Sequence, residues 1–510
     1  MERIQKGRSG CILKKVLELS GSGLTIEDVN RVSRDGWKVK IPAQMMERLT
    51  EARKLVFELS GKGVPIYGCN RGVGWNKDRK VTKEFVSRFN RNMLHSHAVS
   101  VGESASEEDV RAAMVIRLNN LLVGCTGLSP EVVTLIADML NHNIIPLLPQ
   151  KGSVGEADIV ALSHLGLALI GEGKVLYRGE VVSANEAFAA EGLKAVDLAE
   201  KDGLAILSSN ALAAGQACSV FQETEILVKT ADLIACMSLE GINGNVSPLN
   251  EASHKMRPYP RQMETAADMR RYLEGSYLYQ PAPGRPLQDP LSFRCVPQVH
   301  GAVKTAMDYA RENLEIHLNS SDDNPCLLLE ERSITSCGNF DPLVWVLGMQ
   351  NLSIALSHVS KLSCLRSIKL ASPGFTGLSR HLTPNDSTIA FSTIQKVYAG
   401  LDAEIRLLAN PVSMDTFALA GDMEDISTNG PLVMQKHRQI LDDLFYILAV
   451  EVIHAAQAMD LRKDHYGAGT TAALARVRQV VDFYGSDDRI LTEDIERVHD
   501  FLYSGGLLNA

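Results

Sequence analysis

Residues 211–239, ALAAGQACSVFQETEILVKTADLIACMSL, decide the fold class of this 510-residue chain. Apolar side chains recur there at helical spacing with no proline and a single glycine, which predicts one long helix. Residues 299–318, 343–370, 388–408 and 431–460 have the same texture. Helices of this length bury their apolar stripes best against one another, so the second half predicts a helical bundle. Their thin polar faces suggest a bundle shared between subunits.

The first half of the chain has shorter elements and more breakers. Helical patterns cover three stretches, 43–59, 110–124 and 130–141, and the apolar run 159–170 follows a glycine-bounded turn at 152–155. Between the first two helices lies VPIYGCNRGVGW, residues 64–75, whose three glycines and proline predict a loop. We therefore expect a mainly α protein with a mixed N-terminal domain at residues 1–210 and a long-helix core at residues 211–510.

Composition and charge exclude several classes of protein. The net charge of −9 is spread without long single-sign runs, which argues against a nucleic-acid partner. Nine scattered cysteines without a CxxC pair favour reduced thiols over a disulfide framework or a zinc site. The charged N-terminus does not resemble a signal peptide, and no run approaches the roughly 20 apolar residues of a membrane span. These features predict a cytoplasmic protein with no membrane association.

Three places offer residues that suit catalysis. Tyr67 lies in the glycine-rich loop, where a phenolate could remove a carbon-bound proton if a cation or dipole lowered its pKa; anchoring the loop through its hydroxyl is the alternative. His95 and His97 lack acidic or thiol partners at ligand spacing, so we expect hydrogen-bonding histidines and no metal. Arg294, in QDPLSFRC (288–295), offers a fork for a substrate carboxylate or for an internal salt bridge.

A run of acids and one lysine complete the candidates. Asp422, Glu424 and Asp425 fall at an expected helix start, where acids usually stabilise the helix dipole. Lys396 lies inside an apolar helical pattern, where it could stabilise negative charge or lower the pKa of Tyr67. A lysine at the bundle edge with its ammonium in solvent is the alternative.

Several short motifs, taken in order, resemble the aromatic amino acid lyase family, of which histidine ammonia-lyase is the type. Residues 67–74 resemble its YGxNTGFG loop, 91–103 its RNLxxSHxxGxGE segment, 201–205 its KEGLAL, 288–298 its QDxYSLRCxPQ, 323–325 its DNP, 338–340 its GNF and 424–425 its QED. The similarity runs from about Thr50 to the C-terminal region. It implies the ammonia-lyase (fumarase/aspartase-like) fold, a homotetramer with active sites built from several subunits, a catalytic Tyr67 and a carboxylate-binding Arg294.

The chain departs from this family at the residues that make its electrophile. Members carry GSVGASGDLAPLSH, whose Ala-Ser-Gly triplet cyclises to a methylidene-imidazolone, whereas residues 152–164 read GSVGEADIVALSH. Cyclisation needs glycine after the serine, because only an unhindered nitrogen reaches the preceding carbonyl. Ser153 is followed by Val154, so we expect no electrophile and no other cofactor.

Loss of the electrophile points to a substrate whose nitrogen already carries a permanent charge. A trimethylammonium group departs without a covalent adduct, and the chain resembles the ergothionase-like members of the family. The predicted reaction is elimination of trimethylamine from a histidine-derived betaine, converting ergothioneine to thiourocanate or hercynine to urocanate. The alternatives are another electrophile-free elimination or isomerisation on an aromatic amino-acid derivative, and a catalytically inactive scaffold.

We expect the following roles for the residues of the site. The resemblance implies catalytic roles for Tyr67 and Arg294; we add Glu424 and Lys396 as catalytic candidates, and the acidic pair Glu424 and Asp425 could hold the substrate ring. Glu156 or Asp158 would face the trimethylammonium group. The other expected substrate-binding residues are His97, Ser208, Leu291, Asn324 and Phe340. Leu291 replaces the tyrosine of QDxYSLR, and Ser208 replaces the asparagine after KEGLAL, which fits changed amine chemistry and equally a decayed enzyme.

Overall fold

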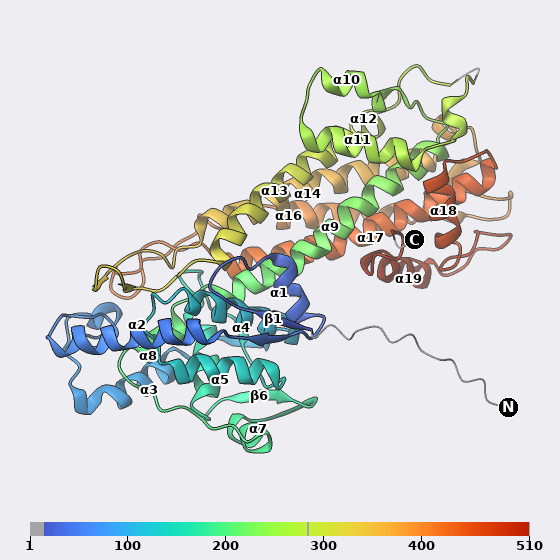
Figure 1. Cartoon of the computed structure of the whole chain (residues 1–510). Helices are drawn as coiled ribbons and strands as arrows, with labels where there is room; N and C mark the ends of the chain where they lie inside the picture. Colours follow the sequence, from blue (N-terminus) through green and yellow to red (C-terminus); the bar gives the residue numbers. More distant parts are fainter. Residues whose placement is uncertain (1–14, 283–284, 509–510) are drawn as a thin grey trace, which may run out of the picture. The chain divides into compact units, whose positions relative to one another are not determined.

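The structure is a computed structural model that describes residues 15–282 and 285–508, which form two compact units. Among these residues, unit 1 comprises 15–218, Glu315–Asp341 and Phe417–Ile426, and unit 2 comprises 219–282, 285–314, Pro342–Thr416 and 427–508. The chain therefore enters unit 1 three times. Figure 1 shows the elements and their labels along the chain.

Unit 1 combines short helices with small sheets. Its helices are α1 (Ile26–Ser33), α2 (Ala43–Gly61), α3 (Val86–His97), α4 (Glu107–Leu122), α5 (Pro130–Asn141), α6 (Ile159–Leu169), α7 (Ala184–Glu191) and α8 (Asp202–Leu207), with 3-10 turns η1 (Gly74–Asn76) and η2 (Lys83–Phe85). Its strands are β1 (Val16–Glu18), β2 (Lys38–Lys40), β3 (Val101–Ser104), β4 (Ile145–Pro146), β5 (Pro149–Lys151), β6 (Lys174–Tyr177), β7 (Glu180–Ser183), β8 (Cys326–Leu328) and β9 (Ser333–Thr335). Strands β1 and β2 pair in parallel, while the pairs β3–β5 and β8–β9 and the sheet β4–β6–β7 are antiparallel.

Local chemistry explains where several of these helices begin. The Thr25 side chain accepts from the Asp28 backbone N–H at the start of α1, and the Asp28 carboxylate binds back in a capping box. Ser106 caps α4 by accepting from Asp109 N–H, and Pro130 occupies the first turn of α5.

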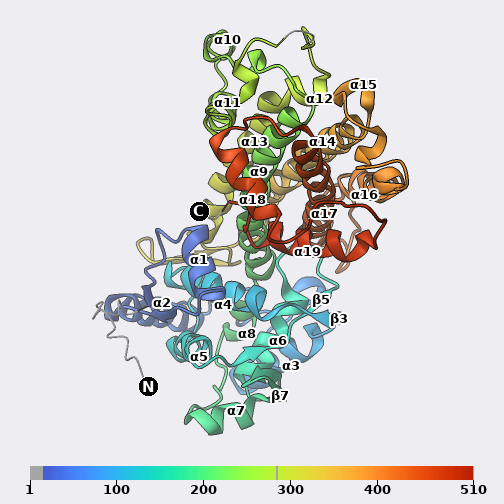
Figure 2. The ribbon, with the colours of Figure 1, turned by 90° about the vertical axis from the view of Figure 1, so that its right-hand side faces the viewer.

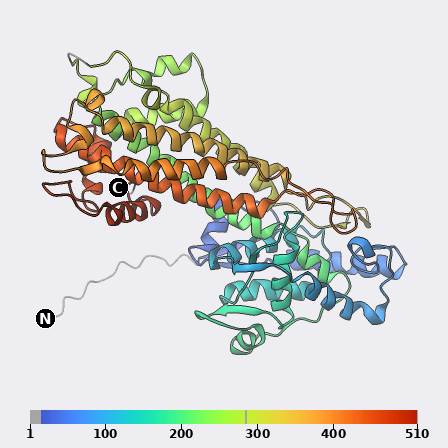
Figure 3. The ribbon, with the colours of Figure 1, turned by 180° about the vertical axis from the view of Figure 1, so that it is seen from behind.

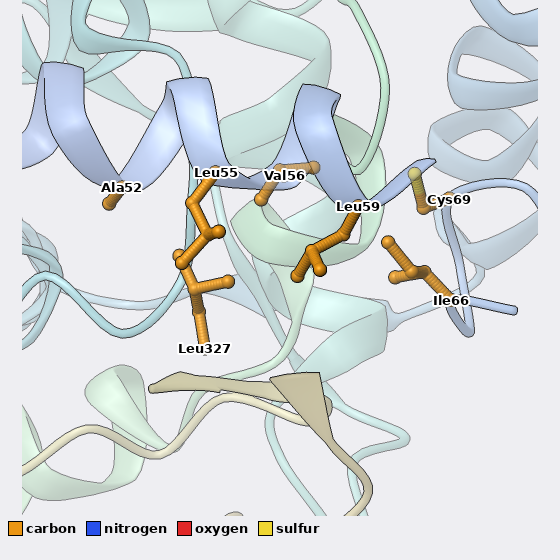
Figure 4. Packing of buried hydrophobic residues seen from close by; sticks show 7 residues of the cluster. All are labelled: Ala52, Leu55, Val56, Leu59, Ile66, Cys69 and Leu327. Atoms are coloured by element: carbon orange, nitrogen blue, oxygen red, sulfur yellow. The ribbon is translucent and has the colours of Figure 1, made fainter. Parts of the chain in front are cut away.

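One apolar cluster shows why the later segment 315–341 belongs to unit 1. Its members come from α2, from the loop after it and from β8: Ala52, Leu55, Val56, Leu59, Ile66, Cys69 and Leu327. Figure 4 shows Leu327 reaching the α2 side chains from the hairpin. Burying Leu327 there removes apolar surface from water and fixes the β8–β9 hairpin to the N-terminal part of the chain.

Unit 2 is built on long helices. Its helices are α9 (Ala211–Gly241, which begins in unit 1), α10 (Glu251–Lys255), α11 (Pro260–Tyr272), α12 (Leu291–Arg294), α13 (Val296–Leu318, which ends in unit 1), α14 (Leu343–Leu370), α15 (Pro373–Thr376), α16 (Gln395–Leu408), α17 (Gly430–Arg462), α18 (Ala468–Val477) and α19 (Leu491–Tyr503), with 3-10 turns η3 (Ser247–Leu249), η4 (Tyr277–Tyr279), η5 (Arg380–Leu382) and η6 (Ala390–Ser392). Helices α14 and α16 both pack along α17. Figures 2 and 3 show these orange and red helices side by side.

The predicted helices agree closely with the observed ones, and the mainly α fold class is confirmed. The two compact units differ from the predicted division at residue 210, because 315–341 and 417–426 pack into unit 1. The predicted helix at 388–408 begins only at Gln395. The carboxylate of Asp488 accepts from the backbone N–H groups of Ile389 and Ala390, both at 2.9 Å, and Ala390 has φ +47°, so this stretch cannot continue the helix.

Three helical stretches are long and apolar enough to cross a membrane, contrary to the expectation from the sequence. Asp202–Gly241, Leu343–Leu370 and Gly430–Arg462 could each cross a membrane by length and composition alone. Within the structure, 94%, 56% and 83% of their most apolar windows are buried. Burial inside the protein accounts for their apolar character, and the absence of membrane association stays a prediction.

Candidate active site

Unit 1 contains a cavity of about 460 Å³ that gathers most of the candidate residues. It is lined by Tyr67, Gly74, Lys77, Glu156, Ala157, Ile159, Leu204, Ser208, Asn324, Ser336, Gly338, Phe340, Asp341, Met423, Glu424, Asp425 and Ile426. All three chain segments of unit 1 contribute to it. Its charged lining consists of four carboxylates and one ammonium, so its chemistry favours a cationic ligand.

The loop that carries Tyr67 is held by its own side chains. The Asn70 amide accepts from Ile66 N–H and donates to the Val64 carbonyl, both at 2.8 Å. Gly68 has φ +68°, and a Cβ there would lie 2.2 Å from Leu204 of α8, so glycine is required for this close approach. The loop therefore packs directly against α8 and points Tyr67 into the cavity.

The Tyr67 hydroxyl accepts a hydrogen bond from the Gly74 backbone N–H at 2.7 Å. Burial raises the pKa of the phenol; the Gly74 N–H opposes this, and the nearby Glu424 carboxylate raises the pKa further. The structure thus supplies one dipole that favours the phenolate, while a base at this position still needs a nearby positive charge. The same hydrogen bond fits both interpretations of Tyr67, a hydroxyl that anchors the loop and a phenolate that acts as a base.

Glu156 occupies a strained turn on the cavity wall. Gly155 and Ala157, its neighbours, have φ +86° and +59°, and Glu156 itself is 9% exposed. Its Oε1 atom is buried and has no hydrogen-bond partner among the described residues. Burial and the nearby carboxylates of Asp341 and Glu424 raise its pKa to about 7. An unsatisfied buried carboxyl oxygen facing a cavity is a marker of a ligand site.

Two further acids come from a tight turn near the end of unit 1. The Leu419 and Glu424 backbones pair, with N–H to O distances of 2.8 and 3.2 Å, and Asp422 has φ +62°. The expected helix start at residues 422–425 is therefore wrong, because this backbone closes a turn and the next helix begins at Gly430. The turn brings Glu424 and Asp425 to the cavity wall.

Asp158 lies outside the cavity lining. Its side chain is fully buried and accepts hydrogen bonds from Ser153 Oγ at 3.0 Å and from Ala213 N–H at 2.9 Å. Burial raises its pKa to about 6, although these donors oppose the shift. Asp158 thus ties the Glu156 turn to α9 within unit 1, and of the two acids only Glu156 lines the cavity.

The other cavity residues are positioned by backbone contacts. Asn324 Oδ1 accepts from Cys337 N–H at 3.0 Å, and Asn210 Nδ2 donates to the Phe340 carbonyl at 2.5 Å. Ser208 follows α8 directly and is 6% exposed. Asn324, Ser208 and Phe340 were all predicted, and each lines the cavity.

Four predicted residues lie elsewhere in the described chain. His97 ends α3, and its Nδ1 is 2.8 Å from the Met93 carbonyl oxygen. In unit 2, Arg294 and Leu291 line a second cavity of about 680 Å³, where Arg294 Nη1 donates to Gln288 Oε1 at 2.9 Å. Lys396 is exposed on α16 of unit 2.

Two charged lining residues, Asp341 and Lys77, were not predicted as site residues. Asp341 directly follows Gly338-Asn339-Phe340, so the GNF motif could have pointed to it. Lys77 lies in a charged stretch, NKDRK, whose composition gives no functional signal. No group of three or more His, Cys, Asp or Glu side chains suited to a metal ion occurs in residues 15–282 and 285–508.

Comparison with known proteins places the chain in a family. Residues 24–479 match the aromatic amino acid lyase family. The chain belongs to this family. It is 36% identical to a histidine ammonia-lyase of Treponema denticola over 492 residues, covering 96% of this chain and 97% of the relative.

Two solved structures of relatives show the same fold over nearly the whole chain. The first is an ergothioneine-degrading ergothionase from Treponema denticola in complex with desmethyl-ergothioneine sulfonic acid, with 45% identity, a TM-score of 0.94 and coverage of 97% of this chain and 100% of that one. The second is a tyrosine aminomutase from Streptomyces globisporus, with 30% identity, a TM-score of 0.91 and coverage of 96% and 97%. These matches show that the chain has the ammonia-lyase fold. The members of the family are carbon–nitrogen lyases.

Proposed function

We propose that this lyase eliminates trimethylamine from a histidine-derived betaine, converting ergothioneine to thiourocanate or hercynine to urocanate. The observation that carries the proposal is Glu156. It stands where the family's electrophile triplet would lie, and its buried Oε1 has no partner in the described chain. A carboxylate here suits a cationic leaving group, whereas ammonia loss requires the electrophile that the sequence lacks. The 45% identity to an ergothionase supports the same substrate class.

In the proposed reaction Tyr67 is the base. Its phenolate takes the proton from the carbon next to the one bearing nitrogen, and the C–H electrons become the new C=C bond. The C–N bond breaks with both electrons on nitrogen, so trimethylamine leaves as the neutral amine. The Gly74 N–H, already 2.7 Å from the hydroxyl, stabilises the phenolate before the transfer.

The substrate supplies the positive charge that the base needs. Burial and Glu424 raise the pKa of Tyr67 in the empty cavity. A trimethylammonium group bound beside Glu156 brings a permanent cation into the same cavity, which favours both the phenolate and the ionised carboxyls. The bound betaine is thus predicted to activate its own base.

Two residues of unit 2 also enter the proposal, Arg294 through the family resemblance and Lys396 through the apolar helical pattern around it. Arg294 is proposed to bind the substrate carboxylate, and Lys396 to stabilise negative charge on the ring. Because the resemblance implies that several subunits build each active site, we propose that Arg294 comes from another subunit of a homotetramer. Glu424 is proposed to hold the ring from within unit 1.

Purified protein incubated with each betaine tests the proposal. We expect release of trimethylamine together with the ultraviolet absorbance of a conjugated acid. Tyr67→Phe should lower kcat by about 10²- to 10⁴-fold, because general-base catalysis has that magnitude. Tyr309→Phe, at an exposed position in unit 2, is the matched control. Ammonia release from plain histidine, or no reaction with either betaine, would overturn the proposal in favour of an ammonia-lyase, a different substrate or a scaffold.

The setting of the enzyme is also a proposal. We propose a small-molecule enzyme of the cytoplasm that binds neither nucleic acid nor membranes; the net charge of −9 disfavours non-specific binding to acidic surfaces such as nucleic acid.

A further inference from the structure

Three cysteines of unit 1 lie on or next to the β8–β9 hairpin. Cys125 lies in the connection between α4 and α5, Cys326 begins β8, and Cys337 follows β9. All eight cysteines in the described ranges are free, so these three are thiols in the structure. Cys125 and Cys337 are partly exposed, while Cys326 is 7% exposed.

The backbones of Cys125 and Cys326 are held next to each other. The Leu327 N–H donates to the Cys125 carbonyl oxygen at 2.8 Å, which joins β8 to the α4–α5 connection at the residue after Cys326. The two thiols are close enough for each to be the largest influence on the pKa of the other, and the Cys326 sulfur lies 4.0 Å from the Leu327 carbonyl oxygen. Cys337 is engaged differently, since its thiol donates to the Asp323 carbonyl oxygen at 3.4 Å.

The surroundings favour the thiolate on one of the two sulfurs. The neighbouring Cys326 thiol, followed by the charges of Arg48 and Lys201, lowers the pKa of Cys125 to about 7, although burial and Asp323 oppose the shift. The Cys125 side chain and burial raise the pKa of Cys326. A partly exposed thiolate next to a protonated thiol is the arrangement of a reactive cysteine with its resolving partner.

We propose that Cys125 and Cys326 form a peroxide-sensitive disulfide site. The Cys125 thiolate attacks one oxygen of hydrogen peroxide, the O–O bond breaks, and the leaving hydroxide takes a proton to become water, so that Cys125 is a sulfenic acid. The Cys326 sulfur then attacks the Cys125 sulfur; its proton and the sulfenic hydroxyl leave as a second water. The two sulfurs lose two electrons and the peroxide gains two.

Oxidation at this site would act on the hairpin that lines the cavity. Cys326 pairs with Thr335 across β8 and β9, and the same segment carries Asn324 and Ser336 to the cavity wall. A covalent link from Cys125 would therefore fix the position of this segment. This inference concerns thiol chemistry and does not depend on the proposed lyase activity.

Mass spectrometry of the full-length protein tests the site. After exposure to hydrogen peroxide and alkylation of the remaining thiols, a non-reducing digest should contain a Cys125 peptide joined to a Cys326 peptide, and dithiothreitol should separate them. Cys125→Ser and Cys326→Ser should each abolish the joined peptide. Cys364→Ser is the matched control, because burial raises the pKa of that thiol to about 12 and it should not affect the reaction.

The same experiment identifies the results that would overturn the inference. A Cys125–Cys337 disulfide would assign a different pair. Full alkylation of both Cys125 and Cys326 after peroxide treatment, measured while exposed methionines become oxidised, would show that the pair does not react.

Discussion

The fold holds one carboxyl group of the cavity, that of Glu156, at an energetic cost. Glu156 lies in a cavity with Asp341, Glu424 and Asp425, and its pKa is raised to about 7 by burial first and by the charges of Asp341 and Glu424 next. A carboxyl in such surroundings is stabilised when a cation enters. The strained turn therefore holds Glu156 where a cationic substrate would stabilise its carboxylate.

Replacing this carboxyl should change the pH dependence of catalysis. Glu156 is neutral below its pKa and charged above it, so kcat/KM for a cationic substrate should rise as pH increases through about 7. In Glu156→Gln that rise should disappear, and kcat/KM at pH 8 should fall about 10-fold or more because one carboxylate–cation attraction is lost. Glu84→Gln, at an exposed position outside the cavity, should keep the wild-type profile. An unchanged profile in Glu156→Gln would remove Glu156 from substrate binding.

The same substitution should stabilise the protein. The folded carboxyl titrates near 7 and the unfolded one near 4.5, so between these values the folded chain binds the extra proton and the free energy of unfolding falls as pH rises. Glu156→Gln removes this penalty, and its free energy of unfolding at pH 8 should exceed that of the wild type by about 1–3 kcal/mol. The difference should vanish near pH 4. Urea unfolding at both pH values measures it, and a destabilised variant at pH 8 would contradict the explanation.

Part of this site could be predicted from residue patterns, and part could not. The motifs pointed to Tyr67, Asn324 and Glu424, because each lies in a recognisable stretch. They could not separate Glu156 from Asp158, two residues apart, since only the backbone of the turn decides that one faces the cavity while the other binds Ser153 and Ala213.

At the scale of elements, buried ion pairs hold the cavity segments together. The Lys201 ammonium, just before α8, is fully buried, pairs with Asp323 and donates to the Thr126 carbonyl oxygen at 2.7 Å. Arg117 of α4 pairs with Asp322 at 2.9 Å. These contacts tie residues 322–324 to the first part of unit 1, so the position of Asn324 depends on them.

Breaking the buried pair should unfold or loosen this region. Lys201→Met leaves the Asp323 carboxylate buried without its cation, and we expect a loss of about 3–5 kcal/mol in the free energy of unfolding. The double variant Lys201→Met/Asp323→Leu should be less destabilised than Lys201→Met alone. Lys194→Met, at an exposed position, is the control. Chemical denaturation compares the four proteins, and equal losses in the single and double variants would reject the coupling.

Helical periodicity predicted the long helices well, because a long run of apolar residues at helical spacing determines their structure. Helix α14 occupies the whole predicted range 343–370. The errors fall where a distant side chain binds the backbone, as Asp488 does at Ile389 and Ala390. The compact units also differ from the predicted boundary where the chain returns to unit 1, as at 315–341, because no local sequence pattern indicates such a return.

For the whole molecule, the surface of α14 supports the predicted association of subunits. Val344, Leu347 and Ile354 recur along one face of this helix and are 57%, 43% and 38% exposed in the single chain. A stripe of exposed aliphatic side chains on a long helix is unfavourable in water unless another surface covers it. A second copy of the chain is the partner that the predicted homotetramer provides.

Shared active sites would let two inactive variants restore each other. If each site takes Tyr67 from one subunit and Arg294 from another, Tyr67→Phe and Arg294→Ala should each be nearly inactive as pure proteins. Coexpressed in equal amounts and assembled at random, they should form mixed tetramers in which about one quarter of the sites receive both intact residues. Activity near one quarter of wild type, in particles that light scattering sizes as tetramers, is therefore expected. If Tyr67 and Arg294 of the same chain met at a site, every site would carry one defect and the mixture would stay inactive.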